Sequence, residues 1–215
     1  MTEPEVLKQR LVKVLKWVST FASAAGAINP IFSVAASLLK VVEKSVDDEY
    51  FITLENEFKK INKELNVILD QNSQNLRQIK KTAVDSQYRD IEENLLSLFS
   101  SYIEIVKAKP QHLECKKKNF IRRYENGKEY QYNLYELVVG KRKVFGQPIL
   151  DVYWEHSKGD KEVMKNLCKD LAYLFFIGCI TTMTYYEFKN DDMISREKEW
   201  EKKINEVKNA IGEWM

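Results

Sequence analysis

Residues 17–39 contain no charged side chain, although 31% of the chain is Asp, Glu, Lys or Arg. A second charge-free run covers residues 171–186. Long uncharged segments are favoured away from water, so each run belongs either in a packed protein core or in a lipid bilayer. The rest of the chain must therefore either cover these two runs with helices that have a polar outer surface, or release the runs into a bilayer.

Neither run is a good candidate for a permanent transmembrane helix. The first is interrupted by Asn29 followed by Pro30 and is rich in Ala, Ser and Gly, so it predicts two closely packed helices and a turn. The second would span about 24 Å as a helix, short of the roughly 30 Å hydrocarbon core. Two interpretations remain open: both segments stay buried in a helical bundle, or they pack there and are released into a bilayer.

Apolar residues recur at helical spacing along much of the chain. They are Leu7, Leu11, Val14, Val18 and Phe21; Leu54, Phe58, Ile61, Leu65, Ile68, Leu76 and Ile79; Tyr88, Ile91, Leu95, Phe99, Tyr102 and Val106; and Trp200, Ile204, Val207, Ile211 and Trp214. Such stripes predict amphipathic helices, and a content of only 7 Gly and 4 Pro favours long ones. We therefore expect an all-α fold, an elongated bundle of five or six long helices in one domain over residues 1–215.

The predicted helices cover about residues 6–26, 29–45, 54–79 and 87–107, another begins at residue 160, and the last carries the 200–214 stripe. The spacing in residues 54–79 is close to a coiled-coil heptad, and we expect the 200–214 stripe to pack along it. Residues 111–159 contain several Gly and a Pro, which predicts short helices and loops. Within that irregular region, residues 130–139 could form a brief strand.

A strongly basic segment lies between residues 107 and 123, with seven Lys or Arg against one Glu. Its candidates for contact with an anionic lipid surface are Lys116, Lys117, Lys118, Arg122 and Arg123. A solvated helix face has the same composition, so that alternative stays open. The net charge of the chain is only +2, which gives no reason to expect a nucleic-acid partner.

The sequence lacks the motifs of catalysis and metal binding. His112 and Cys115 have the spacing of two ligands on one helix face, but no second pair follows, and the three Cys form no C-x-x-C motif. No phosphate-binding loop or nucleophile motif is present. We expect a non-enzymatic protein without a metal or cofactor. The first residues are not basic and then apolar, as in a secretory signal, so we expect a cytoplasmic protein.

Five segments, in this order, resemble the rapunzel family of fish proteins. They are INPIFSVAASLL, VDDEY, QIKKTAVDSQYRDIEEN, FGQPILD and YLFFIGC. The resemblance extends over almost the whole chain and implies a helical protein to which no enzymatic activity is carried over. In architecture alone, the long helices and charge-free runs also look like helical pore-forming toxins of the haemolysin type.

The function we predict is interaction with membranes by apolar helices that are packed away in the soluble form. Residues expected to face the membrane after rearrangement are Phe21, Ile28, Ile31, Phe32 and Val34 of the first run and Phe175, Phe176 and Ile177 of the second. The expected partner is an anionic lipid membrane, on which the chain would associate and oligomerise. The alternative is a soluble intracellular scaffold whose stripes bind partner helices, with a role in growth or development.

Overall fold

The computed structural model describes residues 3–23, 86–144 and 146–214, and within them the chain is all-α. The helices are α1 (Glu3–Ser23), α5 (Ser86–Val106), α6 (Pro110–Asn126), α7 (Tyr130–Val138), α8 (Ile149–His156), α9 (Lys161–Phe188) and α10 (Met193–Gly212). These residues contain no strand beyond an isolated bridge between Val144 and Gln147. The predicted helices over residues 29–45 and 54–79 lie outside the described residues.

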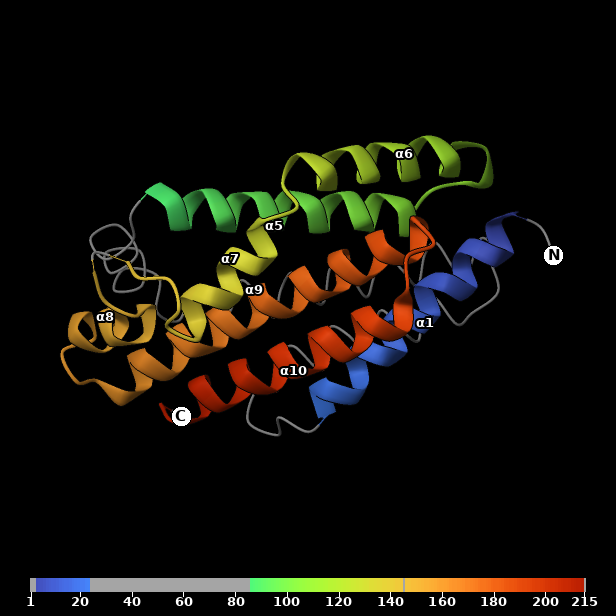
Figure 1. Cartoon of the computed structure of the whole chain (residues 1–215). Coiled ribbons are helices and arrows are strands. Elements are labelled where there is room, and N and C mark those ends of the chain that lie inside the picture. The colour runs from blue at the N-terminus through green and yellow to red at the C-terminus, as the bar shows by residue number, and fades with distance from the viewer. Residues whose placement is uncertain (1–2, 24–85, 145, 215) are drawn as a thin grey trace.

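Helix α9 is the centre of the described bundle (Figure 1). It packs against α1, α5, α6, α7, α8 and α10. In Figure 1, α5 and α6 run along one side of α9, while α1 and α10 run along the other. The second charge-free run is therefore enclosed by helices that bring their apolar stripes to it.

Both long C-terminal helices begin at side-chain caps. Asp160 Oδ1 accepts hydrogen bonds from the Glu162 and Val163 amides, at 2.9 and 3.2 Å, and starts α9 at the predicted position. Asp192 accepts from the Ser195 amide at 3.3 Å and starts α10. Between them Asn190 adopts a φ of 52°, a left-handed conformation that Asn tolerates well and that turns the chain back on itself.

The predicted stripes of α1, α5 and α10 form the core. Their buried members are Leu7, Leu11, Val14 and Val18; Tyr88, Ile91, Leu95, Phe99, Tyr102 and Val106; and Trp200, Ile204, Val207 and Ile211. Trp214 is half-buried and packs on Trp154, with ring centroids 5.5 Å apart. The stripe of α10 packs against α9 and α7. Its predicted contact with residues 54–79 lies outside the described residues.

The strand predicted within residues 130–139 is wrong, because this segment forms helix α7. Tyr and Val suit strands, but Gln131, Leu134, Tyr135 and Val138 are all buried and follow the spacing of one helix face. The same region holds the short helix α8 and the longer α6. Its turns use Gly140 and Gly146 at φ of 77° and 83°, a conformation that favours glycine.

Candidate functional site

The candidate site is α9 together with the side chains that cover it. By length and composition α9 could cross a membrane, and no other helix of the described residues passes the same test. In the folded chain 83% of its most apolar 18-residue window is buried. Core helices of soluble proteins share this character. Length and composition therefore do not separate a core helix from a membrane helix, and the contacts between α9 and the surrounding helices must be considered.

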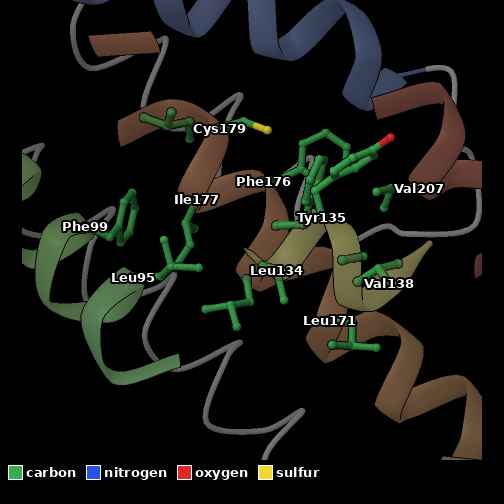
Figure 2. Close-up of a cluster of buried hydrophobic side chains, with 14 of the residues drawn as sticks. Leu95, Phe99, Leu134, Tyr135, Val138, Leu171, Phe176, Ile177, Cys179 and Val207 are labelled. Carbon is green, nitrogen blue, oxygen red and sulfur yellow. The ribbon is translucent and has the colours of Figure 1, made fainter. Parts of the chain in front are cut away.

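The membrane candidates of the second run all lie in the core. Phe175, Phe176 and Ile177 are 0%, 2% and 1% exposed. Figure 2 shows Ile177 directed toward Leu95 of α5. Of the first-run candidates, Phe21 belongs to α1 but its side chain is not described, and Ile28, Ile31, Phe32 and Val34 lie outside the described residues.

Gln131 of α7 makes a polar attachment to α9 inside this apolar core. Its side chain is 1% exposed and its Nε2 donates to the Phe175 carbonyl at 3.0 Å and lies 3.4 Å from Cys179 Sγ. Gly178 leaves the space for it, because a Cβ there would lie 1.7 Å from Gln131 Oε1. Sequence reasoning missed this pair. The available signal was a lone Gly in an apolar helix, which often marks a close approach.

A second buried polar contact joins α6 to α9. The Tyr124 hydroxyl donates to Thr182 Oγ1 at 3.1 Å, and the Tyr124 ring stacks on Tyr185 with centroids 4.1 Å apart. Burial raises the pKa of Tyr124, so the hydroxyl keeps its proton. Helices α6 and α7 thus each make a buried side-chain hydrogen bond to α9.

Helix α10 is attached to α7 through a group of polar side chains that we call the polar clasp: Tyr132, Tyr135 and Lys141 on one side and Glu199 and Glu206 on the other. Tyr132 donates to Glu199 at 3.0 Å, and Tyr135 donates to Glu206. Lys141 Nζ lies 2.7 Å from the Tyr135 hydroxyl and 3.6 Å from Glu206. The hydrogen bond from Tyr135 lowers the pKa of Glu206, which keeps this carboxylate charged.

Cations cover the aromatic rings beside the polar clasp. Lys203 Nζ lies 4.6 Å from the Tyr135 ring centroid, and the Arg196 guanidinium lies 4.4 Å from that of Tyr186. Cation–π contacts of this kind are worth about 0.5–1 kcal/mol when exposed. Helix α10 is therefore held in two ways. On the outside it makes polar contacts that are partly open to water, and on the inside its apolar stripe packs in the core.

The predicted anionic-surface residues divide into two groups on α6. Lys116 pairs with Glu104 at 2.8 Å, Lys117 with Glu114 at 3.8 Å, and Arg123 donates to Ser97 Oγ at 3.1 Å. Lys118 and Arg122 are exposed and form no ion pair within residues 86–144 or the other described segments. Of the five predicted anionic-surface residues, these two make no ion pair or side-chain hydrogen bond with another described residue.

The two possible metal ligands noted in the sequence, His112 and Cys115, are not joined by further ligands in the described residues. His112 and Cys115 are exposed on α6, and the described residues hold no group of three His, Cys, Asp or Glu side chains that could bind a metal. The other two cysteines, Cys168 and Cys179, are buried in α9.

The two buried thiols predict a loss of stability in alkali. Burial raises the pKa of Cys168 to about 12 and raises that of Cys179 as well. Because an unfolded thiol ionises near pH 8.5, stability is fully present below about pH 8.5 and falls as pH rises, by up to about 1.4 kcal/mol per pH unit and thiol. Urea unfolding between about pH 8.5 and 10, under reducing conditions, measures this slope.

The control for this prediction is the exposed third cysteine. The double variant Cys168→Ala with Cys179→Ala should flatten the slope, whereas Cys115→Ala should leave it as in the unsubstituted chain. Equal slopes for all three proteins would contradict the assignment of the alkaline loss to the α9 thiols.

Comparison with known proteins identifies a helical domain family and a curated relative that match this chain. Residues 44–214 match the family described as the cephalotoxin-like middle helical domain. The chain is 50% identical to protein rapunzel of Danio rerio over 213 residues, which cover 98% of this chain and 94% of that protein. No solved structure matches the chain.

Proposed function

The chain belongs to the rapunzel family and carries the cephalotoxin-like middle helical domain, and from this membership we propose that it is a non-enzymatic, membrane-interacting helical protein resembling alpha-pore-forming toxins. In this proposal α9 is stored in the bundle and transferred to a bilayer of anionic lipid. The protein works from the cytoplasm and oligomerises on the membrane.

The observation that carries the proposal is the combination found in α9. A helix long and apolar enough to cross a membrane is buried in a chain of a toxin-like helical family. Exposure of Phe175, Phe176 and Ile177 in water would be unfavourable, by about 1.5–3 kcal/mol for each large side chain. Transfer of the same side chains from the protein core to hydrocarbon carries no such free-energy cost, so α9 could separate from the surrounding helices in a bilayer.

The cover of α9 supports a stepwise release. The polar clasp and its cations are partly exposed, so they can exchange their partners for water or lipid headgroups at little cost. The buried attachments through Gln131 and Tyr124 must then separate. Because these polar groups lie on α6 and α7, the charge-free part of α9, residues 171–186, would enter the bilayer with Thr and Tyr hydroxyls as its main polar side-chain groups.

The direct test is flotation of the full chain with vesicles of anionic phospholipid, followed by release of an entrapped dye. We expect binding to anionic vesicles and dye release, and neither with vesicles of neutral phospholipid. Mild acid is included as a second condition for both assays. Failure to float with anionic vesicles under either condition would rule out the proposed function.

Lys118 and Arg122 give a sharper prediction for the first contact with the membrane. Each basic residue near an anionic surface contributes about 1 kcal/mol, so Lys118→Gln with Arg122→Gln should weaken vesicle partitioning roughly 30-fold. The matched control is Lys198→Gln with Lys202→Gln, which removes the same charge from the exposed face of α10. Equal weakening by both pairs would show that overall charge, and not the α6 face, determines binding.

The alternative of a scaffold that binds partner helices gains no support from the described residues. It requires an exposed apolar stripe, but the stripes of α1, α5 and α10 are buried against α9 and its neighbours. Within residues 3–23, 86–144 and 146–214, the large apolar side chains that are exposed are Leu96 and Ile194, which lie on different helices. A partner helix needs several anchors on one face, which these two residues do not provide.

A further inference from the structure

A cavity of about 150 Å³ lies between the N-terminal half of α1 and that of α6. Both helix segments lie at the same end of the bundle (Figure 1). The cavity is lined by Val6, Leu7, Arg10, Pro110, Leu113, Glu114 and Lys117. The four lining residues that belong to α6 have the spacing of a single helix face, so one face of α6 lines the cavity opposite α1.

Arg10 and Lys117 bring positive charge to this apolar space. Arg10 is partly buried, and its one side-chain hydrogen bond to another described residue runs from Nη1 to the Glu187 carbonyl at 3.2 Å. A guanidinium has five N–H donors, so most of those on Arg10 remain for another acceptor. Lys117 lies 3.8 Å from Glu114 and 5.6 Å from the centroid of the Phe188 ring.

We propose that this cavity binds a single-chain carboxylate amphiphile. Arg10 and Lys117 hold the carboxylate, because a guanidinium matches the two oxygens of a carboxylate in one plane. The apolar lining of Val6, Leu7 and Leu113 takes the first part of the chain. The site is independent of the membrane proposal, since it needs neither a bilayer nor any movement of α9.

Size and charge select this class of ligand. A space of this volume is about the size of a benzene ring, which suits a short segment of one hydrocarbon chain better than two chains side by side. The lining carries two cations and one carboxylate, so its net charge is a single positive one. That charge matches a carboxylate monoanion better than a phosphate dianion.

The test uses octanoate as the probe and the full chain in solution, without lipid. Titration followed by amide ¹H–¹⁵N spectra should give saturable binding at one site, with shifts in the amides of Leu7 and Leu113. Octanol lacks the charge and acetate lacks the chain, so each should bind about tenfold more weakly or worse. Octanol binding as tightly as octanoate, or shifts spread over the surface, would overturn the proposal.

Two variants with matched controls complete the test. Leu113→Trp fills the cavity and should abolish octanoate binding, whereas Leu96→Trp on the exposed face of α5 should not. Arg10→Gln should weaken binding about tenfold, and Arg122→Gln, outside the cavity, should leave it unchanged. Far-UV circular dichroism identifies which variants are folded. A folded Leu113→Trp or Arg10→Gln variant that binds octanoate like the unsubstituted chain would overturn the proposal.

Discussion

Replacement of Trp200 with alanine is expected to lower the free energy of unfolding by about 3–5 kcal/mol, the range for a fully buried aromatic side chain. Trp200 is 0% exposed. Its ring lies 5.0 Å from that of Tyr132 on α7 and 6.3 Å from that of Phe175 on α9, measured between centroids. One side chain therefore joins α10 to both helices, and its removal leaves a cavity at their junction.

Urea unfolding followed by circular dichroism measures this effect. The matched control is Ile194→Ala on the same helix, where the side chain is 68% exposed and the change should be within about 0.5 kcal/mol. A loss below about 1 kcal/mol for Trp200→Ala would contradict the position of α10 on α7 and α9. Under the proposed function, the same variant should release dye from anionic vesicles faster, because α9 is less firmly covered.

The sequence was sufficient to locate the helices that carry a continuous apolar stripe. In α10 every third or fourth residue from Trp200 to Ile211 is apolar and most intervening residues are Glu, Lys or Asn, so one periodicity dominates and the buried face follows from it. Segment 130–139 is shorter and rich in Tyr and Val, which favour strands, so its local composition points away from the helix that forms. Burial of Gln131 and Leu134 against α9, a contact distant in sequence, decides in favour of the helix.

The candidate site could be predicted only in part. The absence of charge in residues 171–186 is local and identified Phe175, Phe176 and Ile177. Which basic residues of α6 are unpaired depends on Glu104 and Ser97 of α5, and no local pattern reports those contacts. The position of Gln131 beside Gly178 likewise joins residues far apart in the chain.

The burial of Phe176 also determines which variants can separate the functional hypotheses. An Asp at position 176 would discriminate between membrane binding and scaffolding only if the side chain were exposed. At 2% exposure, Phe176→Asp places an unpaired charge in the core and unfolds the chain under either hypothesis. Substitution of Lys118 and Arg122 avoids this problem, because both side chains are exposed and the fold does not depend on them.

Gly178→Ala is expected to lower the free energy of unfolding by about 2–3 kcal/mol, even though Ala is about 1 kcal/mol better than Gly within a helix. The added Cβ would lie 1.7 Å from Oε1 and 2.5 Å from Cδ of Gln131. Gln131 must then move, and it loses its contacts with the Phe175 carbonyl and Cys179 Sγ. A buried amide without these partners is unfavourable.

A double-mutant cycle with Gln131→Ala separates the clash from other effects. Without the amide, Gly178→Ala meets no obstacle at this contact and gains the helix propensity of alanine, so it should become stabilising by about 1 kcal/mol. The two substitutions are therefore coupled by about 3–4 kcal/mol, measured by urea unfolding of the four proteins. Coupling below about 0.5 kcal/mol would show that Gln131 and Gly178 are not in contact. Under the proposed function, strong coupling would identify one of the attachments that separate when α9 leaves the bundle.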